Sequence, residues 1–114
     1  MLTREALVAY GANVQEGLGR CLNNEAFYLR LVGMLKDDGH VAQLRAALDR
    51  KDLKGAFEAA HALKGSLSNL ALTPVLKPVM EMTELLREGR NMDYSELMSE
   101  VQTQWDRLMD MINS

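Results

Sequence analysis

Residues 53–70 read Leu-Lys-Gly-Ala-Phe-Glu-Ala-Ala-His-Ala-Leu-Lys-Gly-Ser-Leu-Ser-Asn-Leu and carry the clearest periodicity in the chain. Apolar residues recur there three and four positions apart, which is the spacing of one buried face of an α-helix. They are Leu53, Ala56, Phe57, Ala60, Leu63, Leu67 and Leu70. Asp52 stands just before them, where a carboxylate caps the first turn of a helix. The stretch therefore predicts a long amphipathic helix that ends near Leu70 or Leu72.

Shorter helical patterns lie on both sides of this central helix, separated by short polar breaks. The expected helices run from about 3 to 11, 13 to 22, 24 to 38, 41 to 50, 74 to 89 and 93 to 112. Short connections make neighbouring helices antiparallel. We therefore expect an all-α fold, an up-down antiparallel four-helix bundle with one or two short N-terminal helices across one end. Because no break is long enough to act as a linker, residues 1–114 are expected to form a single domain.

The composition agrees with a helical fold. The 114 residues include 19 Leu, 12 Ala and 8 Met, against 7 Val, 1 Ile and 4 Thr, and aromatic residues make up only 5%. Leu, Ala and Met favour helices, whereas β-branched and aromatic residues favour strands. These counts argue against an all-β fold and against a parallel sheet of the Rossmann type.

Charge and cysteine content exclude several classes of function. The net charge is −3, so the chain lacks the basic excess that is typical of nucleic-acid-binding domains. Cys21 is the only cysteine, which excludes an internal disulfide and a zinc site of several thiolates. No secretory leader and no apolar run near the ~18 residues of a membrane span is present. We therefore expect a cytoplasmic protein that binds neither nucleic acid nor membrane.

Only two histidines are available for chemistry, and no motif for nucleotide or zinc binding accompanies them. His40 follows Asp38-Gly39 at a helix junction, where an exposed structural residue is the expected role. His61 lies inside the central helix, which makes it the stronger candidate. Arg87 and Arg90 lie near the end of the following helix, where cations are favoured by the helix dipole in any case. They are therefore not assigned to a site.

The neighbours of His61 distinguish it from an ordinary surface histidine. On a helical wheel, Lys64, Gly65 and Ser68 share a stripe with His61 beside the leucine face, because residues three and four apart are neighbours on a helix. Glycine inside a helix costs about 1 kcal/mol relative to alanine, and the usual local reason is close approach by another surface. The stripe thus presents an imidazole, an ammonium group and a gap to a partner.

The stretch Ala60–Leu70 resembles the signature of histidine-containing phosphotransfer (Hpt) domains, Ala-His-x-Leu-Lys-Gly-x-x-x-Asn-Leu. The likeness extends more weakly over about residues 11 to 113. The chain departs from the family pattern at the residue after this motif. The family commonly has Gly after Asn-Leu, whereas this chain has Ala71. Alanine keeps that position small, so close packing is expected there. Pro74 and Pro78 are expected to alter the following helix and with it the partner surface.

The resemblance implies a phosphorelay intermediate of two-component signalling. Such a protein accepts a phosphoryl group on its histidine from the phospho-aspartate of a receiver domain and passes it to another receiver. By this resemblance His61 is the phosphorylated nucleophile and Lys64 stabilises the phosphoryl charge. Imidazole is largely neutral and nucleophilic near pH 7, which suits that role. The residues expected to contribute to binding are Gly65, which leaves space, Ser68, which donates a hydrogen bond, and Phe57 and Leu72, which flank the imidazole as an apolar docking surface.

The resemblance also implies the partners. They are response-regulator receiver domains and a sensor histidine kinase. Such a kinase is called hybrid when it carries a receiver domain of its own. Metal and most catalytic groups would come from the receiver, so the chain is expected to need no cofactor, to hold no metal and to have no kinase or ATP-binding activity. A monomer is expected.

Two other classes of function stay open at the sequence level. One is a binding module that docks a receiver or kinase and inhibits it without transfer, and the other is a structural helical bundle acting in assembly. Neither requires Lys64 and Gly65 beside a histidine. Met1 favours a separate chain over a domain excised from a larger histidine kinase, which is the remaining alternative.

Overall fold

The computed structural model describes all 114 residues, and every regular element in it is a helix, which confirms the all-α prediction. No helix has both the length and the apolar character needed to cross a membrane. The elements are α1 (Arg4–Tyr10), α2 (Val14–Arg20), α3 (Glu25–Gly33), the 3₁₀ turn η1 (Met34–Asp37), α4 (His40–Asp49), α5 (Leu53–Asn69), α6 (Thr73–Arg87) and α7 (Ser95–Asn113).

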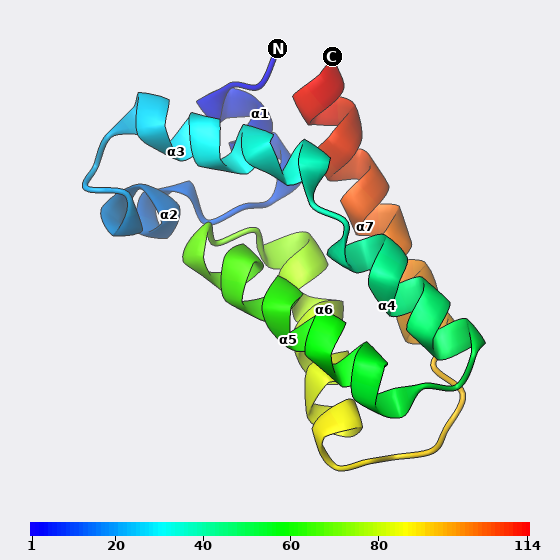
Figure 1. Cartoon of the computed structure of the whole chain (residues 1–114). Helices are drawn as coiled ribbons and strands as arrows, with labels where there is room; N and C mark the ends of the chain where they lie inside the picture. Colours follow the sequence, from blue (N-terminus) through cyan, green and yellow to red (C-terminus); the bar gives the residue numbers. More distant parts are fainter.

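The four C-terminal helices form the expected bundle. Helices α4, α5, α6 and α7 each pack against the next along the chain, and α4 also touches α7, which closes the bundle. The N-terminal helices α1, α2 and α3 gather at one end, near both chain termini (Figure 1). Of these, α1 and α2 are the two short N-terminal helices that the sequence predicts, with 7 residues each. The third, α3, continues through η1 toward α4.

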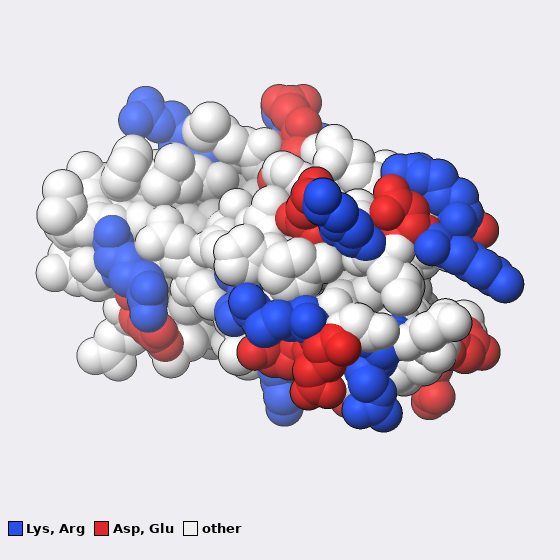
Figure 2. Space-filling model, turned by 60° about the horizontal axis from the view of Figure 1, so that its bottom comes forward, with Lys and Arg blue, Asp and Glu red and all other residues white.

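The surface carries both signs of charge side by side. Lys and Arg alternate with Asp and Glu over much of the face shown in Figure 2, and its left-hand part carries few charged side chains. This face therefore carries charges of both signs, as does the sequence as a whole, with 13 basic and 16 acidic residues.

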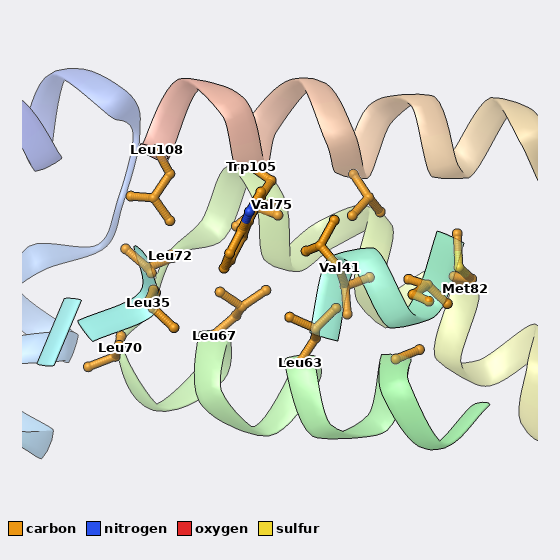
Figure 3. Packing of buried hydrophobic residues seen from close by; sticks show 14 of the residues in the cluster. Leu35, Val41, Leu63, Leu67, Leu70, Leu72, Val75, Met82, Trp105 and Leu108 are labelled. Atoms are coloured by element: carbon orange, nitrogen blue, oxygen red, sulfur yellow. The ribbon is translucent and has the colours of Figure 1, made fainter. Parts of the chain in front are cut away.

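One continuous core joins the helices. It contains 27 buried apolar residues drawn from every helix of the chain. Leu63 and Leu67 of α5 point into the bundle, toward side chains of the other helices that include Val41 and Trp105 (Figure 3). Each of these leucines is fully buried, which stabilises the fold by roughly 1.5–3 kcal/mol per side chain relative to exposure. The apolar face of α5 therefore fixes the opposite face, which holds His61, toward the outside.

The corner between α5 and α6 is tied to the N-terminal helices. The buried hydroxyl of Tyr28 donates a hydrogen bond of 2.9 Å to the carbonyl of Leu70, and the backbone N–H of Asn13 donates one of 2.9 Å to the carbonyl of Ala71. Burial raises the pKa of Tyr28 to about 12, so its hydroxyl remains a donor at neutral pH. These bonds hold the end of α5 in place.

Ala71 adopts a left-handed backbone conformation with φ 54° and is buried. Glycine takes this conformation readily, whereas an L-residue with a Cβ pays roughly 1–2 kcal/mol for it. The glycine that the family commonly has after Asn-Leu therefore has a conformational reason as well as the packing reason expected from the sequence. Here the corner is kept with alanine.

The prediction that Leu72 flanks the imidazole as a docking surface is wrong. Its side chain is 0% exposed and lies in the core, near Leu35 and Leu108 (Figure 3). A continuous helix from His61 to Leu72 would set both side chains on one face, but α5 ends at Asn69 and the chain turns at Ala71. Leu72 instead precedes the first residue of α6 as its N-cap.

Candidate functional site

His61 is exposed near the middle of α5. Phe57, one turn earlier on the same helix, stacks against the imidazole with ring centroids 5.6 Å apart and an angle of 21° between the planes. Side chains four residues apart on a helix are neighbours, so the helix itself produces this stack. The imidazole of His61 hydrogen-bonds no other residue of the chain, which leaves its ring nitrogens available to a partner.

His40 has a structural role. It is the first residue of α4 and is partly buried. Its Nδ1 lies 2.8 Å from Oδ1 of Asp38, and the same carboxylate oxygen accepts a hydrogen bond of 2.8 Å from the backbone N–H of His40. The ring is thus engaged at the start of a helix, as its position at the junction predicts, and His61 is the one histidine whose ring is free.

Lys64 and Ser68 lie on the same stripe of α5 as His61. Both are half-buried, while Leu63 and Leu67 on the opposite face are fully buried. Lys64 forms no ion pair within the chain, and the hydroxyl of Ser68 forms no hydrogen bond there. The structure therefore brings together an unpaired ammonium group and an unpaired hydroxyl on the face that carries the imidazole.

Two glycines of α5 have different reasons to be glycine. A Cβ at Gly55 would lie 2.4 Å from the Asp52 carboxylate that caps the helix, so the capping carboxylate leaves no room for a side chain at this position. A Cβ at Gly65 would meet nothing within 4 Å. No internal contact explains the absence of a side chain at Gly65, one turn after His61. The open space at this position is accessible to a partner.

Helix α6 adds two charged residues that the sequence analysis did not assign to the site. The guanidinium of Arg87 lies 5.1 Å from the centroid of the Phe57 ring, on which His61 stacks. Its Nε donates a hydrogen bond of 3.0 Å to Oε2 of Glu84. This bond, together with the positive charges of Arg87 and Lys64, holds the pKa of the Glu84 carboxyl below its usual range.

The contact of Arg87 with Phe57, on which His61 stacks, joins this part of α6 to the face of α5 that carries the imidazole. Arg90 does not belong to the site, since its guanidinium pairs with Glu88 at 3.6 Å beyond the end of α6. The sequence contains only a weak indication that Arg87 belongs to the site. It lies in the stretch Leu85–Gly89, which resembles the end of the family's following helix, but its distance from Phe57 depends on how two helices pack.

The structure is thus a helical bundle that presents one exposed, unpaired imidazole at its surface, beside an unpaired lysine and an open glycine. The family model described as Hpt domain matches residues 32–111. The chain therefore belongs to the Hpt domain family. No curated protein and no solved structure matched the chain.

Membership in this family implies histidine phosphotransfer in a phosphorelay, and Hpt domains generally interact with receiver domains and kinases. The matched range begins at the end of α3 and runs through most of α7. Helices α1 and α2, and the part of the resemblance noted upstream of residue 32, lie outside this match.

Proposed function

We propose that this chain is a phosphorelay intermediate that accepts a phosphoryl group on His61 from the phospho-aspartate of one receiver domain and donates it to another. The observation that carries the proposal is the exposed and unpaired imidazole of His61, with the unpaired Lys64 and the open position Gly65 on the same stripe of α5. A docking module or a structural bundle would require none of these three features together.

The bonds that form and break in the transfer step belong to the two proteins, and any metal ion that assists the step is expected on the receiver. The lone pair on the unprotonated ring nitrogen of His61 attacks the phosphorus, a P–N bond forms, and the P–O bond to the receiver's aspartate breaks with its electron pair returning to that carboxylate. The other ring nitrogen keeps its proton. The reverse sequence loads the next receiver. Lys64 would stabilise the charge on the phosphoryl oxygens, since such transfers depend mainly on positioning and electrostatic stabilisation.

The exposed face of α5 and α6 is the proposed docking surface. Seven residues, or about two turns, separate Phe57 from Lys64 on α5 and Arg87 from Met80 on the antiparallel α6. Because Arg87 lies over Phe57, Met80 is expected opposite Lys64 and Gly65. Met80 is 43% exposed, so with the half-buried Phe57 it supplies apolar surface on either side of the charged groups. All of these residues lie on one copy of the chain, so the proposal requires no oligomer.

The direct test is phosphoryl uptake. Incubation with a receiver domain carrying ³²P on its aspartate should transfer label to this chain, and that label should be acid-labile and stable in alkali, as a phosphoramidate is. The matched control is a receiver whose aspartate cannot be phosphorylated. Failure of the wild-type chain to take up label from a panel of receivers that it binds would reject the proposal and favour the docking module.

Gly65→Ala should separate stability from transfer. Alanine is expected to raise the free energy of unfolding by roughly 0.5–1 kcal/mol, because no neighbour obstructs the Cβ and helix propensity improves. Transfer from the receiver should slow by about tenfold or more, because the methyl group shifts the partner away from the in-line geometry. Urea unfolding and the initial rate of label uptake measure the two effects.

Gly33→Ala is the control for this variant, since Gly33 lies at the end of α3 and a Cβ added there would also meet nothing within 4 Å. The free energy of unfolding of Gly33→Ala should rise by a similar amount, and this variant should take up label at the wild-type rate. An uptake rate of Gly65→Ala equal to that of Gly33→Ala would show that Gly65 leaves no space that a receiver uses.

A further inference from the structure

Glu84 is an acidic residue beside the proposed position of an anion. It is exposed on α6, three residues before Arg87, which lies over Phe57. Besides the hydrogen bond from Arg87, the positive charge of Lys64 on α5 contributes to holding the pKa of the Glu84 carboxyl group below the usual range. A phosphoryl group adds about −1.5 to −2 charge near neutral pH. No step of the proposed transfer involves a carboxylate at this position. The negative charge of Glu84 would instead repel the phosphoryl group on His61.

The contacts of Glu84 also determine where Arg87 lies. With Nε bonded to Glu84 at 3.0 Å and the guanidinium 5.1 Å from the Phe57 centroid, Arg87 is held over the Phe57 ring. Phe57 in turn covers one face of the imidazole of His61. The carboxylate thus engages a cation that would otherwise be free to move toward the phosphoryl oxygens.

We propose that Glu84 is a positioning residue that lowers the affinity of His61 for the phosphoryl group, by holding Arg87 over Phe57 and by repelling the phosphoryl oxygens. This inference rests on the proposed function. Its consequence concerns the equilibrium in which phospho-His61 and a receiver's free aspartate exchange with free His61 and phospho-aspartate. Glu84 shifts this equilibrium toward the receiver, so the chain passes the group on instead of storing it.

Glu84→Gln keeps the shape of the side chain and removes its charge. The ratio of phospho-His61 to phospho-aspartate at equilibrium should rise by about three- to tenfold at low salt, the range expected for unit charges several ångströms apart near a protein surface. The increase should shrink as salt is raised toward 1 M, because exposed charges are then screened. A merely structural effect of the substitution would not depend on salt in this way.

Two further variants make the measurement specific. Glu16→Gln removes a matched carboxylate, which accepts a hydrogen bond of 2.9 Å from Arg20 on α2, and should leave the ratio unchanged. Arg87→Gln in the Glu84→Gln background tests how much of the effect of Glu84 acts through the guanidinium of Arg87. It should reverse a portion of the increase in the ratio of phospho-His61 to phospho-aspartate. The melting temperature of each variant, followed by circular dichroism, should match that of the wild type.

The outcomes separate this inference from the function on which it rests. Absence of label on the wild-type chain overturns the proposed function and this inference with it. Wild-type uptake at His61 with an unchanged ratio in Glu84→Gln overturns this inference alone, as does an increase that is equal at low and high salt. A salt-sensitive increase confined to Glu84→Gln supports it.

Discussion

Replacement of His61 by glutamine should abolish phosphoryl uptake, with the rate falling by about a thousandfold or more, as removal of a nucleophile does in covalent catalysis. A glutamine amide nitrogen has no available lone pair to attack phosphorus, although its size and polarity suit an exposed helical position. The stability of the variant should stay within about 0.5 kcal/mol of the wild type, since the imidazole forms no hydrogen bond in the chain. Label transfer from a phosphorylated receiver and urea unfolding provide the two measurements.

His40→Gln is the control for this experiment. That ring is engaged with Asp38 at the start of α4, so its loss should affect stability slightly and leave transfer intact. If His61→Gln takes up label at the wild-type level, the phosphorylated residue lies elsewhere. Loss of uptake in His40→Gln with His61→Gln unaffected would reverse the assignment of the two histidines.

Leu72→Ala should have the largest effect on stability of the changes considered. Truncation of a fully buried leucine lowers the free energy of unfolding by about 2–5 kcal/mol, which is a large part of the roughly 5–15 kcal/mol that holds a domain folded. The variant should unfold at markedly lower urea concentration. Under conditions where it is folded, its affinity for a receiver should equal that of the wild type.

Leu22→Ala supplies the comparison, because Leu22 is 87% exposed and its truncation should change stability by no more than about 0.5 kcal/mol. Loss of receiver affinity in Leu72→Ala without loss of stability would restore the surface role that the sequence suggested for this residue.

The part of the site that lies on one helix could be predicted from the sequence. His61, Lys64, Gly65 and Ser68 follow one another at intervals of three and four, and helix geometry alone sets them on one stripe. The structure retains that stripe because Leu63 and Leu67 bury the other face. No information about a second helix is needed for this inference.

Residues on the neighbouring helix could not be placed in the same way. Whether Arg87 reaches Phe57 depends on the register of α6 against α5, which is set by core packing and by the corner between the two helices. The burial of Leu72 is hidden from the sequence for a related reason, since helical periodicity gives no warning that Ala71 takes a left-handed conformation and redirects the chain. In both cases the position of the side chain depends on how one helix packs against another, and the pattern within a single helix does not reveal it.

The hydrogen bonds from Tyr28 and Asn13 to the corner after α5 have a practical consequence for working with this domain. Both donors precede residue 32, where the family match begins. A recombinant fragment trimmed to the matched range would leave the carbonyl of Leu70 without the tyrosine hydroxyl and that of Ala71 without its backbone donor. Truncation boundaries for expression should therefore retain α1 to α3, so that the helix bearing His61 keeps its anchored end.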